Sequence, residues 1–255
     1  MTGETWLIVG ASSSIARAFA QLVAAQGHRV ILTGQDKAHL DACAADIEIR
    51  HGTVARVIAF DAMALDGHAA FLDACGAEAI GTLNIFLAIA SVPDDAEGAA
   101  DFSAARRTVM TSYVAPISLL WHLTPMLAKQ AGGRVIILGS IAGERGRDEN
   151  YIYASAKAGL HVFAQGLRAR LSALGVAVTT AKLGFVDTSR TWGRVPASLS
   201  ASPITTARAC LAAAERAETV VYIPGAWRWI ALMLRLMPES LITKLATRKK
   251  YRPID

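Results

Sequence analysis

The chain alternates short, purely apolar runs with longer segments in which apolar residues recur every three or four positions. Runs without interleaved polar residues are typical of strands buried on both faces, and the periodic segments predict helices. The expected strands cover residues 5–10, 29–33, 54–60, 82–88, 134–139, 176–182 and 219–223. The expected helices cover 14–26, 37–50, 66–76, 101–130, 151–174 and 203–217. This alternation predicts right-handed crossovers and an α/β Rossmann fold, a doubly wound parallel sheet in three layers.

Composition supports a single α/β domain with a short addition. The chain has 255 residues, of which 53% are hydrophobic and 18% are charged. A core of ample size is expected, with part of the surface apolar or covered by a partner. We expect residues 1–225 to form the Rossmann domain and residues 226–255 to form a C-terminal extension. The irregular stretch 184–202 is rich in Ser, Thr, Gly and Pro, which suits a substrate lid.

Cysteine and histidine usage indicates neither a metal site nor disulfides. Cys43, Cys75 and Cys210 lack metal or redox spacing, and the six histidines are scattered. The first strand begins almost at the N-terminus, which leaves no room for a signal peptide, and no apolar run reaches 18 residues. We therefore expect a cytoplasmic protein with reduced thiols and no metal.

Tyr153 and Lys157 are the first candidate chemical groups. Residues four apart share one face of a helix, so the two side chains point the same way. An ammonium nearby favours the phenolate and lowers the phenol pKa, which makes the pair suited to proton exchange with a carbonyl. Ser140 follows the apolar run Arg134–Gly139, at the carboxyl end of a strand, where ligands bind in open α/β sheets.

A turn of small residues, Gly10 to Ala16, joins the first strand to the first helix. Small residues and free amides at a helix N-terminus suit the pyrophosphate of a dinucleotide. A simple capped turn is the alternative interpretation.

Together these features resemble the short-chain dehydrogenase/reductase family, from Trp6 to about Pro224. The resemblance implies that nicotinamide supplies hydride while Tyr153 protonates the carbonyl oxygen. Ser140 would orient that oxygen, and Lys157 would hold the nicotinamide ribose and lower the Tyr153 pKa. Ser112 stands where the family often has Asn on its long fourth helix, so a proton relay there would need an extra water or run more slowly.

The resemblance also implies a set of cofactor-binding residues. In the turn Gly10 is retained, whereas Ser14 and Ala16 replace two family glycines. Ala88–Ser91 replaces the family's Asn-Asn-Ala-Gly, and Lys182–Thr188 matches its Pro-Gly-x-x-x-Thr with Leu183 in place of Pro. The expected cofactor contacts are Gly10, Ser12, Ser13, Ser14, Ile15, Gln35, Asp61, Ala90, Tyr153, Lys157, Gly184, Val186 and Thr188.

The end of the second strand bears on the choice of cofactor. An acid there would bind the ribose 2′-hydroxyl of NAD and repel a 2′-phosphate. Gly34 and Gln35 occupy these positions, and Asp36 follows one residue late. The alternative interpretation of Asp36 is that it begins the next helix. The pattern favours NADP(H) over NAD(H), although a dedicated basic residue is also missing. Asp61 matches the family aspartate near adenine, or is a turn residue.

The extension holds an apolar helix between Pro224 and Pro238, too short to cross a bilayer. Arg228 and Arg235 form a narrow basic stripe on it, and Trp227 and Trp229 suit a membrane–water interface. The basic residues of the tail would add attraction to anionic lipid; they are Lys244, Arg248, Lys249, Lys250 and Arg252. Docking on an anionic membrane surface and burial in a homo-oligomer both remain open.

The segments Gly139–Arg147, Tyr151–Gly159 and Tyr222–Ile230 bring a narrower resemblance, to the decaprenylphosphoryl-2-keto-ribose reductases. It implies reduction of a lipid-linked keto sugar by an enzyme peripheral on the inner face of the membrane. Two alternatives stay open: a reductase of a small soluble ketone or alcohol, and a non-catalytic nucleotide-sensing protein. The family favours a homo-dimer or homo-tetramer through the long fourth and fifth helices. The short terminal basic excess does not predict nucleic-acid binding.

Overall fold

The computed structural model describes residues 3–91, 101–130, 132–148, 150–187 and 199–242. Seven parallel strands form one sheet in the order β3-β2-β1-β4-β5-β6-β9. The strands are β1 (Thr5–Val9), β2 (Arg29–Gly34), β3 (Ala55–Ala59), β4 (Leu83–Leu87), β5 (Arg134–Ser140), β6 (Ala177–Leu183) and β9 (Val220–Ile223). The strand order reverses direction between β1 and β4, which opens a crevice at their carboxyl ends.

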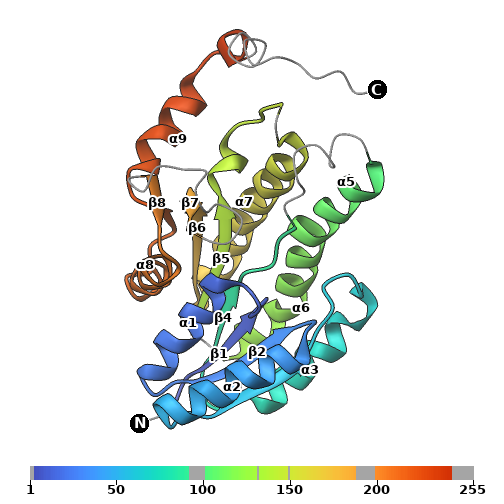
Figure 1. Cartoon of the computed structure of the whole chain (residues 1–255), viewed down its shortest axis with the longest axis vertical. Coiled ribbons are helices and arrows are strands. Elements are labelled where there is room, and N and C mark those ends of the chain that lie inside the picture. The colour runs from blue at the N-terminus through green and yellow to red at the C-terminus, as the bar shows by residue number, and fades with distance from the viewer. Residues whose placement is uncertain (1–2, 92–100, 131, 149, 188–198, 243–255) are drawn as a thin grey trace.

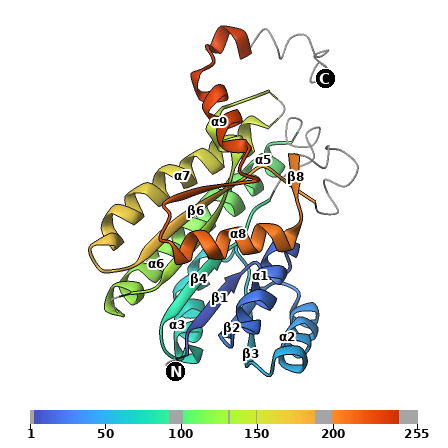
Figure 2. The ribbon, with the colours of Figure 1, turned by 90° about the vertical axis from the view of Figure 1, so that its left-hand side faces the viewer.

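Helices cover both faces of this sheet, as Figures 1 and 2 show. One hydrophobic cluster packs α1 (Ser14–Ala25), α2 (Lys37–His51) and α8 (Pro203–Glu215) on one face. The other cluster packs α3 (His68–Glu78), α6 (Ala115–Lys129) and α7 (Tyr151–Ser172) on the opposite face. The predicted doubly wound, three-layer α/β fold is confirmed, because strands buried on both faces need helices on both sides.

The helix expected over residues 101–130 is interrupted. It consists of α5 (Phe102–Val109), a π-helical turn over Met110–Val114, and α6. Pro116 has no N–H to donate to the carbonyl of Ser112, so a regular α-helical ladder cannot continue there. The wider turn places Ser112 inside the domain, fully buried.

The segment 184–202 is anchored at its base. Phe185–Val186 (β7) pairs with Ser200–Ala201 (β8) in a small second sheet. Trp227 begins the helix α9 (Trp227–Leu236), and its indole Nε1 donates to the carbonyl of Leu199 at 3.0 Å. The lid predicted for this stretch falls mainly on residues 188–198, outside the described residues.

Helix α9 lies at the end of the molecule opposite the N-terminus in both views (Figures 1 and 2). Among the described residues, no helix combines the length and apolar character needed to cross a bilayer. The basic tail residues Lys244 to Arg252 lie outside the described part of the chain.

Candidate active site

Ser140 ends β5 and continues into a 3₁₀ turn, Ile141–Glu144, which we call the serine loop. The Ser140 hydroxyl accepts from the main-chain N–H of Ala142 at 3.2 Å. Gly143 lets this loop lie directly on α7, since a Cβ there would come within 2.8 Å of the Ala158 nitrogen. The close packing brings Ser140 and the first two turns of α7 to the same end of the sheet.

Tyr153 and Lys157 lie on that part of α7. The Lys157 ammonium is 5.9 Å from the centre of the Tyr153 ring. Lys157 is 2% exposed, and its Nζ donates to the carbonyl oxygen of Leu138 at 3.0 Å. Burial lowers the pKa of Lys157 to about 8, because the charged form loses its hydration. The structure therefore brings the predicted Ser140, Tyr153 and Lys157 together.

His161 lies one helical turn beyond Lys157 and contacts the main chain of Ser140. The main-chain N–H of Ser140 donates to His161 Nε2 at 3.3 Å, which places the ring hydrogen on Nδ1. Burial, with Lys182 and Lys157 nearby, lowers the His161 pKa to about 3. The ring is therefore neutral. Sequence reasoning described His161 only as a satisfied helix histidine; its spacing of four from Lys157 was the available signal.

The Ser112 side chain links the π-helical turn by hydrogen bonds to the segment that follows β4. Its hydroxyl donates to the carbonyl of Ser91 at 3.0 Å and accepts from the Ser91 N–H at 3.0 Å. This two-way bond uses the donor of the hydroxyl and holds the chain that follows β4. Ser112 therefore has a bracing role in the structure, in addition to its place beside the site.

A cavity of about 550 Å³ opens at the crevice between β1 and β4. It is lined by six of the predicted cofactor contacts, namely Gly10, Ser12, Ser13, Gln35, Asp61 and Ala90. Gly10 has a φ of +85°, and a Cβ there would lie 3.0 Å from the Ala88 carbonyl oxygen. Only glycine fits this close, left-handed position without strain. Arg107 on α5 also lines the cavity, and sequence reasoning missed it because its helix is distant in the chain.

The N-terminus of α1 faces this turn. Ser13 occupies the N-cap position, yet its side chain makes no hydrogen bond to the helix. The first N–H groups of a helix have no partner within it, so they are available to an anion. This arrangement favours the dinucleotide interpretation over the simple capped turn.

The remaining predicted contacts are placed differently. Ile15 is buried in the core beneath α1, so only its main chain can meet a cofactor. Val186 is buried on β7, and Gly184 packs against Trp227, whose Nε1 would lie 2.2 Å from an added Cβ. Thr188 lies outside the described residues. The residues that are described fit a nicotinamide dinucleotide, since an open cradle, free helix amides and the Tyr153–Lys157 pair share one edge of the sheet.

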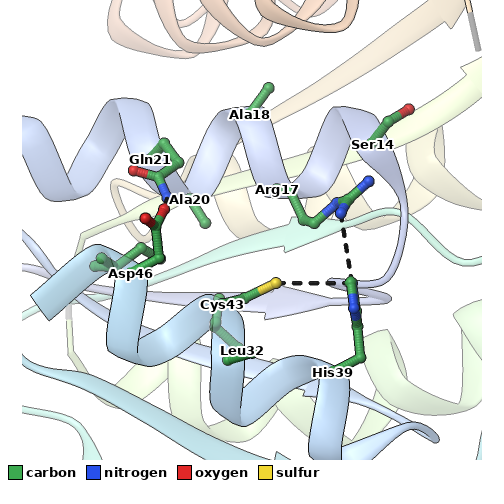
Figure 3. Close-up of a pocket in the computed structure, with 11 residues that line it drawn as sticks. Ser14, Arg17, Ala18, Ala20, Gln21, Leu32, His39, Cys43 and Asp46 are labelled. Carbon is green, nitrogen blue, oxygen red and sulfur yellow. Dashed lines mark hydrogen bonds between the residues drawn. The ribbon is translucent and has the colours of Figure 1, made fainter. Parts of the chain in front are cut away.

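A second cavity, of about 450 Å³, lies between α1 and α2 and includes Ser14 in its lining (Figure 3). Arg17 Nη1 is 3.5 Å from His39 Nε2, and the Cys43 sulfur is 3.7 Å from the same nitrogen. Arg17 has no carboxylate within ion-pair distance among the described residues. Ser14 thus lines a pocket beside the cofactor turn whose charged side chains are Arg17 and Asp46.

Comparison with known proteins agrees with this site. The family model for "short chain dehydrogenase" matches residues 4–197. An uncharacterized oxidoreductase of Mycobacterium tuberculosis is 36% identical over 91% of this chain and 93% of its own length. An uncharacterized oxidoreductase of Streptomyces coelicolor is 30% identical over 94% of each chain.

Solved structures share the fold at lower sequence identity. The bulky-bulky ketone specific alcohol dehydrogenase from Comamonas testosteroni has a TM-score of 0.76 at 22% identity, covering 100% of this chain and 97% of the other. A short-chain dehydrogenase from Sphingobium yanoikuyae, solved with NADPH, has a TM-score of 0.73 at 24% identity, covering 99% and 98%.

The fold and the site thus define an NAD(P)-dependent oxidoreductase. The chain belongs to the short-chain dehydrogenase family.

Proposed function

We propose that this protein is a reductase that transfers hydride from NADP(H) to the keto group of a membrane-associated, lipid-linked substrate. The observation that carries the reductase assignment is the buried Lys157 beside Tyr153, next to Ser140. The cofactor supplies the hydride when it is bound. Everything else is performed by side chains of this chain.

Tyr153 is the proton donor in this proposal. The Lys157 ammonium favours the ionised phenol, so Tyr153 releases its proton readily as the carbonyl oxygen gains charge. The Ser140 hydroxyl donates to the same oxygen, and His161 steadies Ser140 through the main chain. A buried, neutral imidazole adds no charge that would compete with Lys157.

The preference for NADP(H) rests on the groups near the end of β2. Asp36 accepts from the His39 N–H at 3.0 Å as the cap of α2. Asp61 accepts from the Gln35 amide at 2.9 Å. Both carboxylates thus have partners other than a ribose. Arg17 beside the cofactor turn offers a positive charge to a 2′-phosphate.

The membrane-associated substrate is supported by the outer face of α9. Trp229, Met233 and Leu236 are 68%, 55% and 74% exposed on this short helix. Such a face, flanked by arginines, suits the boundary between head groups and acyl chains. The narrower sequence resemblance to lipid-linked keto-sugar reductases supports the same substrate class.

A homo-oligomer is proposed through a different surface. Trp121 on α6 and Val162 on α7 are 65% and 67% exposed, and a second copy would cover them. This partner leaves α9 free for a membrane.

Replacing Tyr153 by Phe tests the reductase mechanism. The variant should lose at least a hundredfold in kcat with NADPH and a soluble ketone, since general acid catalysis contributes on the order of 10²–10⁴. NADPH binding, followed by fluorescence titration, should remain. Unchanged turnover would refute the mechanism. Failure of the unmodified protein to bind either NADPH or NADH would instead favour a non-catalytic role.

A further inference from the structure

A groove of about 900 Å³ lies between the edge strand β9 and helix α9, away from the cofactor cavity. Four cationic side chains line it, and Trp229 and Leu232 form an apolar rim. The cations are Arg168, Lys182, Arg228 and Arg235. Three different elements, α7, β6 and α9, therefore direct positive charge into one hollow.

Carboxylates neutralise this positive charge only in part, because Glu144 pairs with Lys182 and Arg235 but not with Arg168 or Arg228. Among the described residues that line the groove, Glu218 is the only acid, and it pairs with Arg216 at 2.7 Å. Arg168 donates to the carbonyl oxygens of Val178 and Thr219, which leaves its charge uncompensated. Arg228 has no carboxylate within ion-pair distance among the described residues and instead lies 5.9 Å from the centre of the Trp229 ring.

Buried charged side chains form the floor of the groove. Lys182 has a side chain 10% exposed and pairs with Glu144 Oε1 at 2.5 Å. Tyr222 donates to the same oxygen at 3.3 Å, and Arg235 Nε lies 3.5 Å from Glu144 Oε2. Glu144 is held from three sides, so it is committed to the protein. Arg228 and one side of Arg235 remain for a ligand.

We propose that this groove is a binding site for the phosphate of an anionic phospholipid head group. The charge is complementary, arginine side chains bind phosphate oxygens in pairs, and the apolar face of α9 adjoins the rim. Acyl chains would contact Trp229, Met233 and Leu236 while the phosphate sits beside Arg228 and Arg235. The inference rests on the proposed membrane-associated function and names the lipid group that the protein recognises.

The site also adjoins the catalytic centre. Glu144 closes the serine loop four residues after Ser140, so Arg235 contacts both the groove and that loop. A change at Arg235 would disturb the loop as well as the groove. Arg228 is therefore the better residue to test, because its guanidinium lies over the Trp229 ring and forms no ion pair with Glu144.

The test is flotation of the full-length protein with two kinds of vesicle. One kind contains phosphatidylcholine alone, and the other contains roughly 30% phosphatidylglycerol, enough anionic lipid to give a negative surface potential. The unmodified protein should bind only the anionic vesicles. Arg228→Gln should lower that affinity about tenfold or more. One surface charge contributes about 1 kcal/mol, or roughly fivefold, to nonspecific attraction, so a larger loss indicates a built site.

Arg208→Gln is the matched control, because Arg208 is exposed on α8 and does not line the groove. It should lower vesicle affinity by no more than about fivefold, the roughly 1 kcal/mol that one charge contributes to nonspecific attraction. Equal losses in both variants would overturn the site and leave general charge attraction. If Arg228→Gln changes the oligomeric state and the protein does not bind vesicles, the lipid site is overturned, and the groove is instead a contact with a second copy of the chain.

Reductase turnover of the unmodified protein on a soluble ketone is measured in parallel. Turnover without binding to anionic vesicles would refute the groove as a lipid site and leave the reductase mechanism standing. Vesicle binding without turnover of the soluble ketone would support the groove and count against the reductase mechanism. Competition by inorganic phosphate at millimolar concentration should weaken vesicle binding, whereas chloride at equal ionic strength should weaken it less.

Discussion

The two halves of the active site are built on different principles. The cofactor half, around β1 and β4, depends on a close backbone turn of small residues such as Gly10 and Ala90, with Asp61 and Arg107 also in the lining of its cavity. The catalytic half, around β5 and α7, consists of buried titratable groups, including Lys157, His161 and Glu144 with its partner Lys182. The cofactor half therefore depends mainly on close backbone packing, and the catalytic half depends mainly on buried charged groups.

This difference explains where the chain departs from its family. A cradle of backbone tolerates Ser14 in place of glycine as long as the turn and the helix amides keep their positions. A buried charge has no such freedom, because removing one partner leaves the other unpaired in a dry interior. Most departures from the family pattern accordingly lie in the cofactor half. In the catalytic half the Ser-Tyr-Lys set is retained, and Ser112 in place of Asn is the exception.

The largest expected effect comes from removing charge in the catalytic half. Lys157→Met should lower kcat/KM on the order of 10²–10⁴-fold, because Tyr153 loses the ammonium that favours its ionised form. Stability should hold or rise, since an apolar side chain of similar size replaces a desolvated ammonium. Steady-state kinetics and thermal melting measure the two effects.

Lys129→Met, at the exposed end of α6, is the matched control and should change neither quantity appreciably. A melting temperature that falls sharply for Lys157→Met would show that the lysine stabilises the fold instead.

Shape in the cofactor half is tested by Gly10→Ala. The added Cβ would lie 2.9 Å from Ile89 Cγ2 at a φ of +85°, so the turn must shift. Overpacking and strain of this kind cost about 2–4 kcal/mol, and NADPH affinity should fall at least tenfold. Fluorescence titration measures it.

The comparison variant is Gly166→Ala. Gly166 lies in α7 with open space around its Cβ position, so the substitution should stabilise the helix by about 1 kcal/mol. Equal cofactor affinity in Gly10→Ala and the unmodified protein would contradict the shape argument.

Lowering the pH should decrease the free energy of unfolding through His161, which is buried in the catalytic half. Its folded pKa of about 3 lies below the ordinary value of 6.5, so the unfolded chain takes up the proton first. The free energy of unfolding is therefore highest above pH 6.5 and falls as the pH drops toward 3. Between pH 7 and pH 5 the loss from this group is about 2 kcal/mol.

Urea unfolding at several pH values checks this slope. His161→Gln keeps an acceptor for the Ser140 N–H and should flatten the dependence. A slope unchanged in that variant would assign the acid sensitivity to other groups.

The smallest effect is expected for Ser14→Gly, which restores the family residue in the cofactor turn. The helix amides keep their positions, so NADPH affinity should change by less than about threefold, or under 1 kcal/mol. A gain of tenfold or more would mean that Ser14 limits cofactor binding.

Much of the fold could be predicted because its signals are local. Apolar runs and helical periodicity predicted all seven strands of the main sheet within one or two residues. The interruption at Ser112 was missed, although Pro116 in the middle of the helix expected over residues 101–130 was the available signal, since an interior proline breaks the hydrogen-bond ladder. The two short strands β7 and β8 were missed because two residues carry no periodicity.

The sequence by itself determined the parallel sheet, the small-residue turn and the spacing of Ser140, Tyr153 and Lys157. Only the tertiary structure decided the contacts between distant residues. Glu144 meets Lys182 because β5 pairs with β6 in a register that aligns Gly139 with Lys182. Arg168 joins Arg228 in one groove because α7 and α9 flank the same edge of the sheet. Periodicity is set by neighbours along the chain, whereas buried charge pairs depend on which strands and helices come to lie side by side.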